Sequence, residues 1–100
     1  MKLFVDDTRE CPDVSEFLCC RDFENAIRIL SYTNFEHISL DYNLGRNSKT
    51  GLNILEWMSE NHKSAPSINI HSSHPIGRSR MYDFAKKHFP NSNITMYSVR

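Results

Sequence analysis

The sequence lacks net charge: 12 Lys and Arg residues balance 12 Asp and Glu residues over 100 residues. A protein that binds nucleic acids in general carries a basic excess that neutralises phosphates, so the balance argues against this class. It is compatible with a small anionic ligand held by two or three local positive groups. The chain also lacks internal repeats and linkers, so we expect a single domain over residues 1–100.

Long apolar runs and paired cysteine motifs are absent as well. No segment approaches the ~18 apolar residues of a membrane span, and the acidic pair at 6 and 7 interrupts the first apolar stretch too early for a signal peptide. The three cysteines, Cys11, Cys19 and Cys20, show no Cys-x-x-Cys spacing. Adjacent cysteines do not easily bridge each other, and zinc would need a distant fourth ligand. We expect ordinary thiols in a cytoplasmic protein.

Short apolar segments alternate with amphipathic ones along the chain. Asp22 and Thr50 are suited to capping helices, and Pro75 suits the first turn of a third helix that ends before Pro90. The spacing predicts strands at 2–5, 16–21, 36–40, 67–71 and 94–99. This alternation predicts an α/β fold with a mostly parallel sheet covered on both faces.

Three of these strands are followed by chemically capable side chains. The first strand ends in Asp6-Asp7, the third in Asp41, and the fourth in His71-Ser72-Ser73-His74. Ligand sites of parallel sheets lie beyond the carboxyl ends of the strands. We therefore expect these groups to converge at one edge of the sheet.

The three aspartates indicate a metal site. Asp6, Asp7 and Asp41 would repel one another when brought together, and a hard divalent cation relieves that repulsion. The sequence therefore predicts Mg2+ or Mn2+ at these carboxylates. The alternative is structural: Asp6 and Asp7 would cap a loop, and Asp41 would begin an Asx turn.

The segment 71–78 runs from a strand directly into a helix N-terminus, where free N–H groups favour an anion. Histidine is the residue type best suited to proton transfer near neutral pH, so His71 and His74 are, with Asp41, the candidate catalytic residues. The predicted phosphate-binding residues are Ser72, Ser73, Gly77 and Arg78. The structural alternatives are a buried, hydrogen-bonded His71, a helix cap at Ser73 or His74, and a solvated Arg78.

This pattern of strand ends resembles the receiver domain of two-component response regulators. The resemblance implies that Asp6 and Asp7 bind Mg2+, that Asp41 accepts a phosphoryl group, and that Ser72 relays the switch. Receivers also carry a lysine after the fifth strand, and this chain has none there. Only a short segment joins the first two expected strands, which leaves the pairing of the second strand open.

A narrower group fits the motifs better. Val5-Asp6-Asp7-Thr8-Arg9, Ser39 to Gly45, Thr50-Gly51 and the segment 71–78 are similar to those of the small cyclic-phosphate-processing receivers. The resemblance implies a truncated, flavodoxin-like receiver fold with about five strands and about three helices. It also implies a cyclic phosphate as the molecule acted upon.

The function expected from these residues is metal-dependent phosphoesterase chemistry on a cyclic phosphate of a nucleotide or an RNA end. Two alternatives remain open. The domain could be a non-catalytic module that binds a phosphorylated small molecule or a protein partner. It could also be a degenerate receiver that accepts a phosphoryl group on Asp41.

Overall fold

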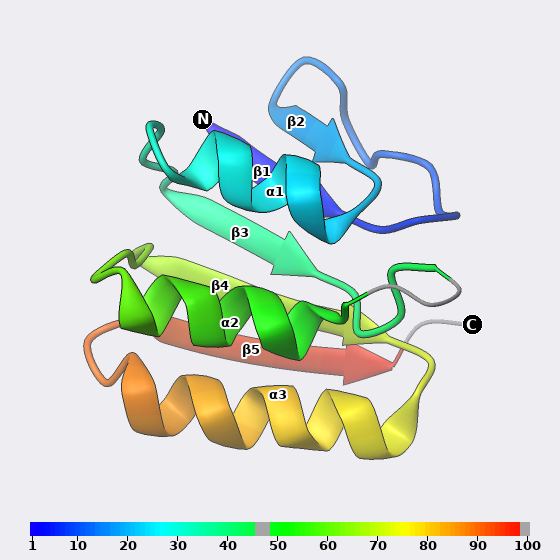
Figure 1. Ribbon diagram of the computed structural model, residues 1–100. Helices are drawn as coiled ribbons and strands as arrows, with labels where there is room; N and C mark the ends of the chain where they lie inside the picture. The colour runs from blue at the N-terminus through cyan, green and yellow to red at the C-terminus, as the bar shows by residue number, and fades with distance from the viewer. Residues whose placement is uncertain (46–48, 99–100) are drawn as a thin grey trace.

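The computed structural model describes residues 1–45 and 49–98, and Val99 of the last expected strand lies outside them. All five strands are parallel in a single sheet of order β2-β1-β3-β4-β5, and their arrows point the same way in Figure 1. The elements in chain order are β1 (Lys2–Val5), β2 (Phe17–Cys20), α1 (Phe23–Leu30), β3 (His37–Leu40), α2 (Gly51–Glu60), β4 (Ser67–Ser72), α3 (Pro75–His88) and β5 (Asn93–Ser98). The predicted alternation is confirmed.

The helices begin at the residues that the sequence suggested. The side chain of Asp22 accepts the backbone N–H of Asn25 at the start of α1. Thr50 and Asn53 form a reciprocal capping box at the start of α2. Pro75 occupies the first turn of α3, and the residue that caps this helix is His74.

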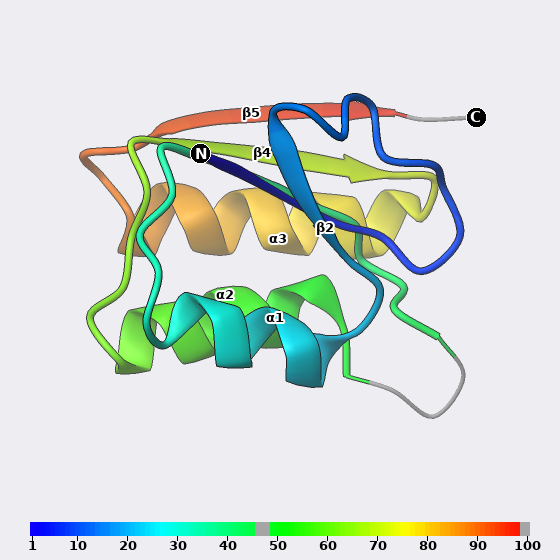
Figure 2. The ribbon, with the colours of Figure 1, turned by 90° about the horizontal axis from the view of Figure 1, so that it is seen from above.

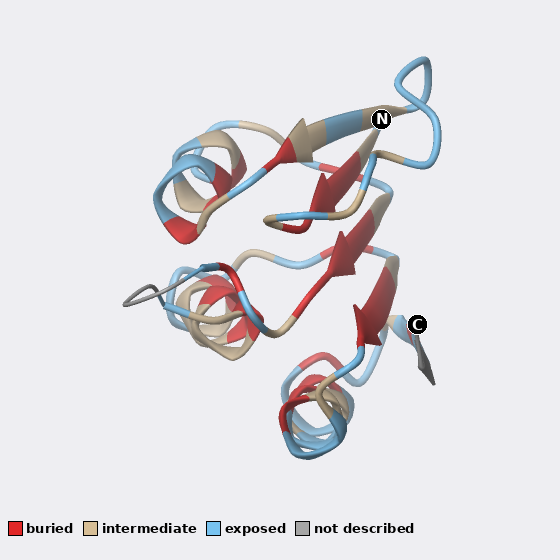
Figure 3. Cartoon of the chain, turned by 90° about the vertical axis from the view of Figure 1, so that its right-hand side faces the viewer, coloured by how far each residue is buried: buried red, intermediate tan, exposed pale blue. Residues whose placement is uncertain are grey.

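All three helices lie on one face of the sheet, as Figures 2 and 3 show, so the expectation of helices on both faces is wrong. The strand order explains this. The helices α1, α2 and α3 lie in the connections from β2 to β3, from β3 to β4 and from β4 to β5. All three connections cross the sheet in the same direction. Right-handed crossovers that step in one direction place their helices on the same face. Only the β1–β2 connection steps the other way, and it contains no helix.

The second strand pairs with the first, although the β1–β2 connection, residues 6–16, is short and contains no helix. β2 lies parallel to β1, with Lys2 opposite Phe17 and Val5 opposite Cys20. The expectation of three ordinary thiols is wrong. Cys11 and Cys19 form a disulfide, and Cys20 alone is free. Their Cα atoms are 6.1 Å apart, because the returning chain brings position 11 beside β2.

The register sorts the strand residues onto two unlike faces. Leu3, Ile38 and Ile68 are opposite one another and fully buried in the core. Ser39, Asn69 and Thr95 form the next row and point away from the helices, since successive residues of a strand alternate. No helix in the described part of the chain is long and apolar enough to cross a membrane.

Candidate active site

The carboxylates of Asp6, Asp7 and Asp41 form an acidic cluster at the carboxyl ends of the strands. One oxygen of each lies within 4.8 Å of the others. Asp6 directly follows β1 and Asp41 directly follows the neighbouring β3, so the parallel register sets them side by side. Asp6 and Asp41 are buried, whereas Asp7 is half-buried. The structure thus brings together all three residues that the sequence singled out for a metal.

Asp6 has a complete set of hydrogen-bond donors. Its Oδ1 accepts the backbone N–H groups of Thr8 and Arg9 at 3.0 and 2.9 Å. Its Oδ2 accepts Nη1 of Arg9 at 2.9 Å and Nε2 of His71 at 3.0 Å. Burial opposes ionisation of Asp6, but hydrogen bonds from Arg9, Thr8 and His71 outweigh it and lower the pKa of this carboxyl group.

Asp41 is in the opposite electrostatic situation. Burial, followed by the charge of Asp6, raises the pKa of Asp41 from 3.8 to about 6. Hydrogen bonds from the Ser72 hydroxyl and the backbone N–H of Tyr42 oppose this rise without cancelling it. The backbone of Asp41 also explains Gly51, since a Cβ there would lie 2.0 Å from the Asp41 carbonyl oxygen. This close approach sets the start of α2 against the end of β3.

Arg9 is the site residue that the sequence reasoning missed. Its Nη1 lies 2.9 Å from Oδ2 of Asp6 and 3.5 Å from Oδ2 of Asp41. The guanidinium therefore contacts two of the three carboxylates of the acidic cluster. The motif Asp6-Asp7-Thr8-Arg9 could have indicated this contact, because a cationic residue follows the acidic pair closely in the sequence. Its orientation depends on the turn of the β1–β2 connection, where Arg21 donates to the carbonyl oxygens of Asp6 and Arg9.

His71 lies behind the acidic cluster, within the sheet. The residue is 1% exposed, and its ring stacks on Phe4 with centroids 4.7 Å apart. Nε2 faces Asp6, and Nδ1 lies 2.7 Å from the hydroxyl oxygen of Ser39. Burial lowers the pKa of His71, although the hydrogen bond to Asp6 and the charge of Asp6 oppose the shift. Both ring nitrogens are occupied by protein partners.

His74 is half-buried, follows β4 by two residues and caps α3. Its Nδ1 accepts the backbone N–H of Gly77 at 2.9 Å, so the neutral ring carries its proton on Nε2. Its ring packs against Tyr42, with centroids 4.9 Å apart. Gly77 faces the same aromatic ring, and a Cβ at Gly77 would lie 2.4 Å from it. Close packing against Tyr42 therefore requires glycine at this position.

The other three predicted phosphate-binding residues, Ser72, Ser73 and Arg78, differ in exposure and in hydrogen-bond partners. The Ser72 hydroxyl contacts Asp41 and also accepts the backbone N–H of His74 at 3.1 Å. Ser73 is exposed. Arg78 is half-buried and donates Nη1 to the Ser72 carbonyl oxygen at 2.6 Å, so it braces the end of β4. The segment 71–78 is thus bound largely to itself, and Ser73 and Nε2 of His74 are its free polar groups nearest the helix start.

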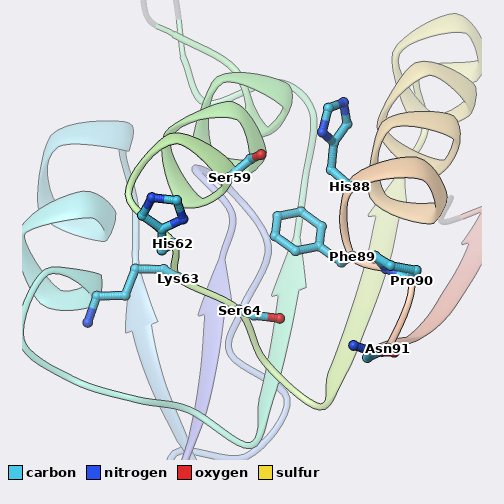
Figure 4. Close-up of a pocket in the computed structure, with 8 residues that line it drawn as sticks. All are labelled: Ser59, His62, Lys63, Ser64, His88, Phe89, Pro90 and Asn91. Atoms are coloured by element: carbon cyan, nitrogen blue, oxygen red, sulfur yellow. The ribbon is translucent and has the colours of Figure 1, made fainter.

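A hollow of about 280 Å³ lies at the other end of the molecule, where α2 and α3 end (Figure 4). It contains none of the predicted site residues. The residues around it precede β4 and β5, at the amino ends of the strands. The acidic cluster lies at the carboxyl ends, so the hollow is separate from it. They are Ser59, His62, Lys63, Ser64, His88, Phe89, Pro90 and Asn91.

Comparison with known proteins agrees with this architecture. No curated protein matches the chain. A crystal structure of a response regulator protein from Burkholderia pseudomallei, with a phosphorylated aspartic acid, a calcium ion and citrate, superposes with a TM-score of 0.65 at 15% identity. The match covers 97% of this chain and 58% of that chain, and it establishes a flavodoxin-like receiver fold. The family model of the cyclic-phosphate processing receiver domain matches residues 1–87, and the chain therefore belongs to that family.

Proposed function

We propose that this domain binds a divalent cation at the acidic cluster and uses it to hydrolyse a cyclic phosphate ester of a nucleotide or an RNA end. The observation that carries the proposal is the approach of Asp6, Asp7 and Asp41 to within 4.8 Å at the edge where parallel sheets bind ligands. Membership of the cyclic-phosphate processing family favours a phosphate as the molecule bound there.

The donor set suits Mg2+ or Mn2+. Three carboxylates supply hard oxygen ligands, and cations of this kind usually combine a few carboxylates with water and phosphate oxygens. The pKa of Asp41 is raised by burial and then by the charge of Asp6, and the cation would relieve the second of these effects. When bound, it would supply positive charge to the phosphate and a more acidic water molecule.

The two histidines would have different roles in the reaction. Nε2 of His74 has no partner among the described residues. In the imidazolium form, with Nδ1 protonated and released from the Gly77 N–H, His74 would protonate the leaving oxygen from Nε2 as the cyclic ester opens and would return to the neutral ring. His71 is buried with both ring nitrogens occupied, and it would act by orienting Asp6. Ser72 and Ser73 would donate to phosphate oxygens, while Gly77 and Arg78 would hold the loop that carries them.

Turnover of a panel of 2′,3′- and 3′,5′-cyclic phosphates with Mg2+ or Mn2+ tests this function. The expected result is metal-dependent release of a phosphomonoester that disappears in Asp41→Asn and falls at least tenfold in His74→Gln. A rate equal to that of Asp41→Asn across the panel would exclude hydrolysis. Binding of the same compounds without turnover would indicate a binding module.

A second candidate function rests on the proximity of the buried Ser72 hydroxyl to Asp41, whose pKa it lowers against the effect of burial. A hydroxyl beside a buried aspartate would stabilise the domain after transfer of a phosphoryl group to that aspartate. Incubation with acetyl phosphate and Mg2+, followed by intact-mass analysis, distinguishes this activity. A phosphoryl adduct lost in Asp41→Asn supports it, and an unchanged mass removes it.

A further inference from the structure

The guanidinium of Arg9 lies within the acidic cluster itself. Nη1 is 2.9 Å from Oδ2 of Asp6 and 3.5 Å from Oδ2 of Asp41, and both carboxylates are buried. A divalent cation needs the same oxygens. The cluster therefore already holds one positive charge, supplied by the chain.

The hydrogen bonds of Asp6 show which donor can leave. A carboxylate offers about four lone-pair positions, and Asp6 accepts four hydrogen bonds. Two come from backbone N–H groups of the turn that follows β1, and these are fixed by the chain path. The other two come from His71 and from the side chain of Arg9.

His71 is held in place by a chain of hydrogen bonds across the sheet. The Thr95 hydroxyl donates to Oδ1 of Asn69 at 2.7 Å, and Nδ2 of Asn69 donates to Oγ of Ser39 at 3.1 Å. The Ser39 hydroxyl then donates to Nδ1 of His71, which places the ring proton on Nε2, facing Asp6. Each polar group in this series of hydrogen bonds donates to the next one, so His71 stays bound to Asp6.

Arg9 has no comparable restraint on its guanidinium. Its side chain is 26% exposed, and its guanidinium is paired with the two carboxylates. Of the four donors to Asp6, it is the one on a partly exposed side chain, whereas two are backbone N–H groups and His71 is buried. A cation that binds Oδ2 of Asp6 must therefore take the place of Arg9.

We propose that Arg9 is an internal cation that exchanges with the divalent ion: it neutralises Asp6 and Asp41 in the metal-free protein and leaves when the ion enters. Its displaced guanidinium is then free to bind the phosphate group that the ion recruits, as a bidentate donor. This inference rests on the proposed function. It makes Arg9 a competitor of the ion and a ligand of the phosphate.

Calorimetric titration of Mn2+ into the metal-free full chain tests the exchange. Arg9→Gln should bind Mn2+ about tenfold more tightly than wild type, because a positive charge in contact with two ligands opposes the ion. Arg28→Gln removes the same charge from the exposed face of α1 and should bind like wild type, within about twofold. Damage to the fold would weaken binding, so the direction of the change separates competition from a structural role.

Equal or weaker Mn2+ binding by Arg9→Gln overturns the exchange while leaving the metal site intact. Absence of Mn2+ binding in wild type, with a normal melting transition, overturns the metal site itself. If Arg9→Gln does not fold, Arg9→Lys replaces it. A lysine side chain is one bond shorter than arginine and its ammonium is more strongly hydrated, so it should hold the two carboxylates less well. Tighter Mn2+ binding by a few-fold is therefore expected, and unchanged binding contradicts the proposal.

Discussion

Nε2 of His71 lies 3.0 Å from Oδ2 of Asp6, a contact that joins β4 to the acidic cluster across 65 positions of the chain. Truncation by His71→Ala would remove one of the four hydrogen bonds that Asp6 accepts, would leave the buried Ser39 hydroxyl without its acceptor, and would open a cavity beside Phe4. We expect a loss of about 2 to 4 kcal/mol in the free energy of unfolding, measured by urea denaturation. His88→Ala, which removes an exposed imidazole from α3, should cost less than about 1 kcal/mol. Equal losses in the two variants would contradict the role of the His71–Asp6 contact.

Stability should depend on pH through Asp41. A carboxyl group with a raised folded pKa stabilises the fold below its unfolded pKa, and this contribution is lost as pH rises through the folded value. For Asp41 that window runs from 3.8 to about 6. Metal-free wild type should therefore lose up to about 3 kcal/mol relative to Asp41→Asn between about pH 3.5 and pH 7. Urea denaturation of both proteins in a chelating buffer checks this, and parallel stability curves would disprove it.

Gly77 should be required for packing against Tyr42. A Cβ would approach the Tyr42 ring to 2.4 Å, so Gly77→Ala should cost about 1 to 3 kcal/mol in spite of the higher helix propensity of alanine. In a Tyr42→Ala background the same substitution should cost much less. A double-mutant cycle by thermal denaturation measures the difference. Additive effects would show that Tyr42 is not the reason for glycine.

The Cys11–Cys19 disulfide should stabilise the β1–β2 connection. It closes a loop with a sequence separation of 8, and loops of this size contribute about 2 to 3 kcal/mol. Reduction and Cys11→Ser should lower the free energy of unfolding by similar amounts. Thiol counting in denaturant should find one reactive thiol, Cys20, in the oxidised protein, and three would disprove the disulfide. A reducing environment would keep the pair as thiols.

The sequence predicted the order of the elements and the acidic cluster because both depend on local patterns. Apolar runs, caps and the positions of Asp6, Asp7 and Asp41 at strand ends are readable one segment at a time. Parallel pairing then brings the strand ends together without further information. The helices on a single face were missed because that feature depends on the strand order, which no local pattern reveals.

The roles within segment 71–78 were harder to predict because they depend on long-range partners. Of the six positions in this segment predicted as catalytic or phosphate-binding, two show this clearly: His71 pairs with Asp6, and Gly77 packs on Tyr42. Arg9 was missed because its position depends on an 11-residue connection, residues 6–16, that contains no helix. Such a path is set by packing against the sheet and not by periodicity.

The central claim is that Asp6, Asp7 and Asp41 hold a divalent cation in place of Arg9. Anomalous diffraction at the manganese edge, from crystals grown with Mn2+, tests it most directly. We expect one strong peak within ligand distance of the three carboxylates, with the Arg9 guanidinium moved away from Asp6 and Asp41. A map without a peak there, with Arg9 still bound between the two carboxylates, would contradict it.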